Sequence, residues 1–188
     1  MKRQFYIWTA GIILLISMSF IDIFMNCRSL NNDILWLLRI PKTLTALIAG
    51  AALALSGIQM QSILRNPLAD PHILGITSGA SLGAAAAALT GIGALSTTMS
   101  AFLGAGITAA LIMTASRKLR EATTLLIFGV MLGFILNAVI SVMQYTSNAE
   151  SLKIFYSWSA GSFSNAGWNE IGILTVTLAT GLAGAIFN

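Results

Sequence analysis

Long apolar segments separated by short polar stretches make up most of the 188-residue chain. A hydrocarbon core about 30 Å thick takes about 20 helical residues to cross, and the apolar segments divide on that scale. The pattern therefore predicts an all-α fold, a polytopic transmembrane helical bundle with about six spans. The predicted spans are residues 5–24, 43–64, 73–95, 99–115, 125–145 and 171–187.

The stretch between the last two predicted spans is too polar to cross a membrane. Its aromatic side chains, Phe155, Tyr156, Trp158 and Trp168, are of the kind that lies at the boundary between lipid and water. We therefore expect a short helix at residues 149–160 that lies on the outer membrane surface.

Composition supports a membrane protein. Hydrophobic residues make up 56% of the chain, charged residues only 9%, and the mean hydropathy is +0.85. A soluble domain carries about 25% charged residues. The net charge of +4 matters mainly through the placement of basic residues near span ends, so nucleic-acid binding is a poor interpretation.

Basic residues lie beside every second predicted span end, and such residues favour the cytoplasmic side. Six of them precede the first span or follow the second and fourth: Lys2, Arg3, Arg65, Arg117, Lys118 and Arg120. Four others lie on the opposite side: Arg28, Arg39, Lys42 and Lys153. This distribution predicts a cytoplasmic membrane protein whose N-terminus is cytoplasmic.

A turn rich in helix-breaking residues joins the second and third predicted spans. The dipeptide Asn66-Pro67 predicts a helix end, because a residue that precedes proline is disfavoured in the α conformation. Asp70 and Pro71 then predict a new helix, with Asp70 as its N-cap and Pro71 in its first turn. We expect this turn to be cytoplasmic.

Glycines recur at helical spacing in two of the predicted spans. Gly75, Gly79 and Gly83 fall on one face of the third span, and Gly129 and Gly133 fall on one face of the fifth. Small residues at such spacing allow a neighbouring helix to approach closely. These five glycines are therefore predicted to be helix-packing positions.

Several polar side chains occur inside apolar spans, where they are costly in lipid. Gln59 and Gln61, near the inner end of the second span, are expected to face protein or a water-filled pathway. Asn137 and Ser141, followed by Gln144, form a stripe on the fifth span. The stripe is compatible both with a lined conduit and with hydrogen bonds between helices. Asp22 suits a solvated helix end or a proton relay.

The sequence lacks the usual marks of an enzyme. No lysine follows a glycine, so the nucleotide-binding pattern GxxxxGK[ST] is absent and energy must come from a partner or a gradient. The GxSxG pattern around Ser81 falls in an apolar helix with the only histidine, His72, before it, unlike a hydrolase elbow. His72 has no partner ligand one helical turn away, so we expect no metal site and no cofactor bound by this chain.

A family resemblance covers almost the whole chain and is densest from Arg39 to Gly83. Its motifs are RIPKTLTALIAGAALALSGIQMQ, RNPLADPxxLGITSGASLGA and the later WSAGSFSNAGW. These motifs resemble the membrane-spanning permeases of bacterial binding-protein-dependent ABC importers, which carry iron–siderophore complexes, haem or cobalamin. The match is much more specific than a single glycine motif.

The resemblance implies partners and roles. Permeases of this family pair as dimers, usually homodimers, receive cargo from an extracytoplasmic binding protein, and are opened by a cytoplasmic ATPase dimer that holds ATP and magnesium. Arg39, assisted by Lys42, matches the basic positions that meet the binding protein. Ala122 and Thr123 match the small or hydroxyl residues of the cytoplasmic gate, although the adjacent Glu121 departs from the family pattern.

Family members are nearly twice as long and have roughly ten spans. The resemblance therefore implies that residues 1–188 form a single permease domain that is incomplete at its C-terminus. A gradient-coupled secondary transporter or channel is the alternative function, and an intramembrane enzyme using Ser81 or His72 is a third. The sequence does not identify the cargo.

Overall fold

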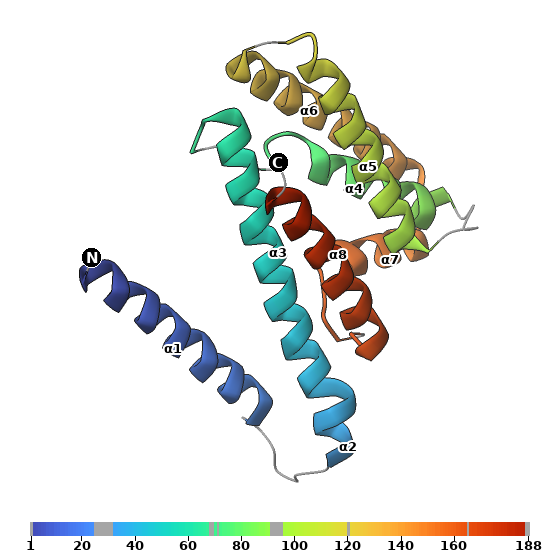
Figure 1. Cartoon of the computed structure of the whole chain (residues 1–188). Helices are drawn as coiled ribbons and strands as arrows, with labels where there is room; N and C mark the ends of the chain where they lie inside the picture. The colour runs from blue at the N-terminus through green and yellow to red at the C-terminus, as the bar shows by residue number, and fades with distance from the viewer. Residues whose placement is uncertain are drawn as a thin grey trace. The chain divides into compact units, whose positions relative to one another are not determined.

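The computed structural model describes residues 2–24, 32–67, 70, 72–90, 96–119, 121–164 and 166–186. Every regular element in these residues is helical, which confirms the all-α prediction (Figure 1). The elements are α1 (Lys2–Phe24), α2 (Asn32–Ile34), the π-helical η1 (Leu35–Arg39), α3 (Ile40–Leu64), α4 (Ile76–Thr90), α5 (Thr97–Ser116), α6 (Ala122–Thr146), α7 (Ala149–Ser159) and α8 (Trp168–Ile186).

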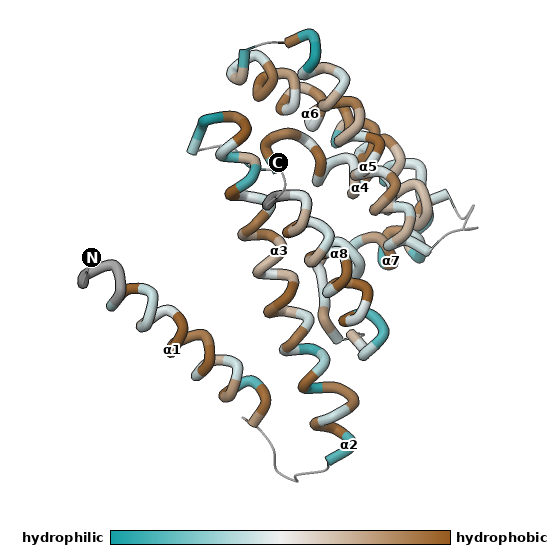
Figure 2. The backbone as a smooth tube through the Cα atoms, in the orientation of Figure 1, coloured by the Kyte–Doolittle hydropathy of each residue, from teal (hydrophilic) through white to brown (hydrophobic). Residues whose placement is uncertain are grey.

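Four helical segments in the described residues are long and apolar enough to cross a membrane. They are Tyr6–Phe24, Asn32–Leu64, Thr97–Ser116 and Ala122–Thr146. Figure 2 shows hydrophobic residues along these helices and hydrophilic ones at the turns after α3 and α5. The chain is thus a multi-pass membrane protein.

The third and sixth predicted spans correspond to α4 and α8. The 15 residues of α4 extend about 22 Å at 1.5 Å per residue, less than a hydrocarbon core of about 30 Å. The 19 residues of α8 include Asn169 and Glu170 in the first turn. Neither helix is among those with the length and hydropathy of a span, so a count of six spans stays a prediction.

The chain folds as two compact units. The first comprises Met1–Ala54 and Phe163–Asn188, and the second comprises Leu55–Ser162. Within the first unit, the indole N–H of Trp168 on α8 donates to the backbone carbonyl of Trp36 at 3.1 Å, and the two rings lie 6.2 Å apart. Side-chain contacts of this kind link its helices.

Helix α4 is the centre of the second unit and packs against α5, α6 and α7. Two clusters of buried side chains surround it. One, at the end of α4 that meets α7, is built from Ala84, Ala85, Ala88, Leu89, Ala101, Ile140 and Phe155. The other joins the end of α3, the turn before α4, the end of α5 and the start of α6, and consists of Leu64, Leu74, Ile112 and Leu125.

The short helix expected at residues 149–160 is confirmed as α7, which runs from Ala149 to Ser159. Asn148 caps it by accepting a hydrogen bond from the Ser151 N–H at 2.8 Å. The expectation that Phe155 lies at the membrane surface is wrong. Phe155 is 5% exposed because α7 turns it into the core, whereas the neighbouring Tyr156 is 55% exposed.

Candidate functional site

The end of α3 closes with a left-handed residue that is not glycine. Arg65 has φ 47°, its N–H donates to the Ser62 carbonyl at 3.3 Å, and the Asn66 N–H donates to the Gln61 carbonyl at 3.2 Å. This pair of bonds is the usual closure of a helix whose last residue turns left-handed. The helix therefore ends where Asn66-Pro67 predicts, with Pro67 exposed.

The prediction that a helix restarts at Asp70 and Pro71 is wrong. Asp70 does cap, but its carboxylate accepts the His72 N–H at 3.0 Å in a tight turn, and Pro71 lies outside the described residues. Helix α4 begins only after Gly75, which has φ +77° and accepts the Gly79 N–H at 3.0 Å. The positive φ of Gly75 separates the turn from the helix, because it departs from helical geometry.

Helices α4 and α5 touch through their backbones. A Cβ atom at Gly79 would overlap the Thr108 side chain and stand 2.9 Å from the Gly104 carbonyl oxygen. A Cβ atom at Gly83 would overlap the Ser100 carbonyl oxygen. These two glycines face α5, as the spacing of small residues favours.

Gly75 faces a different helix from the other two glycines of its motif. Its hypothetical Cβ would lie 2.9 Å from the Gly129 carbonyl oxygen and 3.2 Å from the Gly133 Cα on α6. Next to it, Leu74 is 1% exposed and contacts Gly129. The expected single face of Gly75, Gly79 and Gly83 is therefore wrong, because Gly75 precedes the helix and packs on α6.

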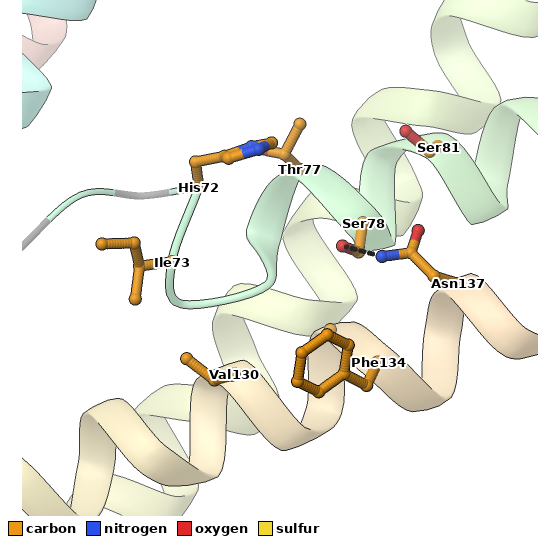
Figure 3. Close-up of a pocket in the computed structure, with 9 residues that line it drawn as sticks. His72, Ile73, Thr77, Ser78, Ser81, Val130, Phe134 and Asn137 are labelled. Atoms are coloured by element: carbon orange, nitrogen blue, oxygen red, sulfur yellow. Dashed lines mark hydrogen bonds between the residues drawn. The ribbon is translucent and has the colours of Figure 1, made fainter.

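A cavity of about 260 Å³, lined by polar and apolar side chains, lies between the turn before α4, the first half of α4 and the middle of α6 (Figure 3). Its floor includes Gly133, whose missing side chain leaves room next to Ser78. The residues that line it are His72, Ile73, Thr77, Ser78, Ser81, Val130, Gly133, Phe134 and Asn137.

The side chains of the polar stripe on α6 form hydrogen bonds with different partners. The Asn137 side-chain amide donates to the Ser78 hydroxyl at 3.2 Å, which joins α6 to α4, and Asn137 also lines the cavity. The Ser141 hydroxyl instead donates to the Asn137 backbone carbonyl at 3.0 Å. Asn137 thus forms the expected hydrogen bond between helices and Ser141 bonds within its own helix, whereas the lining of a conduit by either residue stays a prediction.

The other predicted pathway residues lie on α3. Gln59 is half-buried and Gln61 is exposed, and neither lines the cavity. Their proposed contact with a pathway stays a prediction.

The two residues matched to the gate begin α6. Ala122 and Thr123 are both exposed, and the Glu121 carboxylate before them accepts the Thr124 hydroxyl at 3.5 Å. The buried cluster around Leu64 and Leu125 holds the start of α6 at the same end of the second unit as the turn after α3. The turn and the gate positions, far apart in sequence, are thus brought to one end.

Arg39 and Lys42, matched to the docking positions, differ in their surroundings. The Arg39 guanidinium donates to the Ile23 carbonyl at 3.0 Å and the Asp22 carbonyl at 3.4 Å, at the C-terminal end of α1. The buried Thr43 hydroxyl donates to the Asp22 carboxylate at 2.8 Å. Lys42 is exposed. Asp22 is therefore a bonded helix-end residue, and sequence reasoning missed Thr43, which lies one helical turn beyond Arg39.

The geometry gives little support to an enzymatic role for His72 and Ser81. Ser81 lies inside α4 rather than on a strand-to-helix turn, although both side chains line the cavity. Within the part of the chain that the structure describes, no group of three His, Cys, Asp or Glu side chains could hold a metal ion. Sequence reasoning missed Thr77 in the cavity wall. The spacing of Thr77, Ser78 and Ser81 on an apolar helix was the available signal.

Comparison with known proteins identifies the family. Residues 5–188 match the model of the FecCD transport family. The chain belongs to the FecCD transport family. This confirms, at the level of the family, the resemblance to importer permeases drawn from the sequence motifs.

Two vitamin B12 import permeases are similar to this chain over most of its length. The vitamin B12 import system permease protein BtuC of Klebsiella pneumoniae is 36% identical over 147 residues, which are 77% of this chain and 44% of that protein. The corresponding Salmonella newport protein is 38% identical over 138 residues, 72% of this chain and 42% of its own length. The chain thus spans less than half the length of the curated relatives it matches.

A solved structure of a metal-chelate type ABC transporter in an inward-facing conformation is similar to this chain. It is 30% identical, superposes with a TM-score of 0.77, and the match covers 90% of this chain and 58% of that one.

Proposed function

We propose that this FecCD family chain is a transmembrane permease subunit, or part of one, of an ABC importer for cobalamin, iron–siderophore complexes or haem. The observation that carries the proposal is the family match, which runs from residue 5 to residue 188. The similarity to the vitamin B12 import permeases BtuC and to the metal-chelate transporter with a TM-score of 0.77 supports this cargo class.

The chain would provide the passage and partners would provide the energy. The sequence has no GxxxxGK[ST] pattern, so ATP and magnesium belong on a separate cytoplasmic ATPase dimer. A second copy of the permease completes the passage, and an extracytoplasmic binding protein delivers the cargo. Close backbone packing of α4 against α5, and of the turn before α4 against α6, suits helices that move as units, because packed interfaces shift between discrete arrangements.

The orientation follows from the basic residues. With the N-terminus in the cytoplasm, the turn after α3 and the positions Ala122 and Thr123 lie at the cytoplasmic side, where the gate operates. Arg39 and Lys42 then lie at the outer side. Of these two, the exposed Lys42 is the better placed to meet an acidic binding protein, since the Arg39 guanidinium bonds to the end of α1.

Reconstituted transport tests the proposal. The protein that the gene encodes is placed in proteoliposomes with its ATPase and binding protein, and uptake of cyanocobalamin, hemin and a ferric siderophore is measured. We expect uptake of at least one cargo that requires ATP and stops when the ATPase carries a substitution of its catalytic glutamate. Uptake that persists without nucleotide and collapses with an ionophore would instead support a gradient-coupled carrier.

A further inference from the structure

The cavity between the turn before α4 and α6 carries hydrogen-bonding groups but no fixed charge. Among the described residues that line it, none is Lys, Arg, Asp or Glu. Three hydroxyls, one amide and the His72 imidazole face it, together with the apolar side chains of Ile73, Val130 and Phe134. These polar groups lie on otherwise apolar helices, and polar side chains on membrane helices are costly and commonly functional.

The hydroxyls of this cavity are not used by their own helix. Several other hydroxyls on helices donate to a backbone carbonyl three or four residues earlier, as those of Thr90, Thr108 and Thr114 do. Among the described residues, no hydrogen-bond partner is found for the hydroxyls of Thr77 and Ser81. These two groups are therefore available to a ligand.

The hydrogen bond between α4 and α6 leaves one donor and one acceptor of the bonded pair unused. Asn137 donates to the Ser78 hydroxyl at 3.2 Å, which leaves the hydroxyl proton of Ser78 and the amide oxygen of Asn137 without a partner in the described residues. If the amide is turned over, the pair still keeps one donor and one acceptor. The cavity thus offers both kinds of group within a short distance of each other, on facing helices (Figure 3).

We propose that this cavity receives a neutral carboxamide group at the edge of the cargo, an inference that rests on the proposed function. A carboxamide presents a donor and an acceptor, which matches the groups left by Ser78, Ser81 and Asn137. A carboxylate would lose its hydration without gaining a cationic partner, which is unfavourable. The cavity therefore favours cargo edged with amides over cargo edged with carboxylates.

The size of the cavity limits what enters it. A volume of about 260 Å³ is below the range of about 300 to 1,000 Å³ typical of pockets that enclose a whole small ligand. The cavity accommodates a side group, while the apolar faces of Val130 and Phe134 contact the adjoining hydrocarbon of the cargo. It is a point of selection along a passage rather than an enclosure for a complete metal chelate.

The test compares cargo classes and variants in the reconstituted importer. Cyanocobalamin carries neutral carboxamides at its edge, and hemin carries propionates. We expect faster ATP-dependent uptake of cyanocobalamin than of hemin, and about tenfold slower uptake of cyanocobalamin in Asn137→Leu, the loss expected for one or two hydrogen bonds. Thr114→Ala, whose hydroxyl bonds within α5, should leave uptake unchanged. Faster uptake of hemin, or unchanged uptake in Asn137→Leu, overturns the proposal.

A labelling measurement covers the case in which Asn137→Leu fails to fold. Ser81→Cys, a nearly isosteric change, is treated with a charged, membrane-impermeant methanethiosulfonate reagent, with and without cyanocobalamin. We expect labelling that cyanocobalamin slows several-fold. A cysteine that is never labelled shows that another segment fills the cavity, and one that is labelled but not protected shows that the cargo bypasses it. Either result overturns the proposal.

The two proposals fail in different ways. If the unmodified protein shows no ATP-dependent uptake of cyanocobalamin, hemin or ferric siderophore, the proposed function is wrong. The protection of Ser81→Cys by cyanocobalamin can still be measured in the purified protein, and its presence or absence then decides the cavity by itself.

Discussion

Different contacts stabilise each of the two units of this FecCD family chain internally. In the second unit, Gly79, Gly83, Gly104 and Gly129 lie so close to a neighbouring backbone that a Cβ atom would collide with it. In the first unit, Gly11, Gly50, Gly172, Gly181 and Gly184 have nothing within 4 Å of the place a Cβ atom would occupy. Glycine content alone therefore does not indicate a helix contact.

The difference lies in what each glycine faces. At the close contacts of the second unit, a glycine meets a small residue or bare backbone of another segment, and close packing supplies the attraction that the hydrophobic effect cannot supply in lipid. The first unit relies on hydrogen bonds from Arg39, Thr43 and Trp168. In that unit, the α1 segment Tyr6–Phe24 has none of its side chains buried by the chain itself.

Gly104→Ala should reduce the free energy of unfolding more than the other substitutions that test this comparison. A Cβ atom there would overlap the Gly79 carbonyl oxygen and stand 3.1 Å from the Gly83 Cα, so α4 and α5 must move apart. We expect a loss of about 2 kcal/mol in the free energy of unfolding, measured by denaturant titration in detergent micelles. Gly106→Ala, on the same helix, meets nothing within 4 Å and should cost nothing. Equal effects of the two substitutions would show that α4 and α5 are not in backbone contact.

Gly129→Ala should have the next largest effect, at the contact between α6 and the turn before α4. Its Cβ atom would lie 2.8 Å from the Leu74 Cα and 3.1 Å from the Leu74 carbonyl oxygen. Because the strain is milder than at Gly104, we expect a cost of about 1.5 kcal/mol in the same titration. Gly133→Ala, one turn later, places its Cβ atom at 3.5 Å from Gly75 and Ser78, which is ordinary contact. A larger cost at Gly133 than at Gly129 would contradict this geometry.

Much of this arrangement could be predicted from the apolar pattern, because a membrane helix needs a long run of apolar residues. The helix α7 and the end of α3 could also be predicted, since polar caps and proline act locally. The start of α4 was not. Asp70 and Pro71 read locally as a helix start, but the positive φ of Gly75 is set by its contact with Gly129 and Gly133, which lie more than fifty residues later.

For the candidate site, the sequence could predict some of the polar residues but not which of them contact one another. Asn137 was recognised as polar in an apolar span, but its partner Ser78 lies on another helix. The spacing of Thr77, Ser78 and Ser81 marks a polar cluster on α4 without showing which hydroxyl bonds to Asn137. The roles of Arg39, Lys42, Ala122 and Thr123 rest on the family resemblance and stay predictions. For Arg39, the bonds to the end of α1 add a structural role that no local pattern indicates.

Arg39→Gln tests whether the first unit depends on its polar contacts. Removal of the guanidinium leaves the Asp22 and Ile23 carbonyls without this cation at the C-terminal end of α1, where a positive charge is favourable. We expect a local loss of about 1 kcal/mol, seen as roughly fivefold faster hydrogen exchange in the last turns of α1. Lys42→Gln removes the same charge from an exposed position three residues away and should leave that exchange unchanged. If both variants behave alike, the effect is one of net charge and the bond to α1 is unimportant.

Arg65→Gly should have an effect of the opposite sign, a gain in stability. Arg65 holds φ 47° at the end of α3, in the second unit, where the left-handed conformation costs a residue with a side chain about 1 kcal/mol. Glycine adopts that conformation freely and keeps both closing hydrogen bonds, so the free energy of unfolding should rise by about 1 kcal/mol. Arg65→Ala removes the same charge without relieving the backbone and should not stabilise the protein. A gain in Arg65→Ala as large as in Arg65→Gly would assign the effect to the lost charge. A gain in the glycine variant alone would show that the second unit, although tightly packed, retains strain where the chain leaves α3 for the turn that packs on α6.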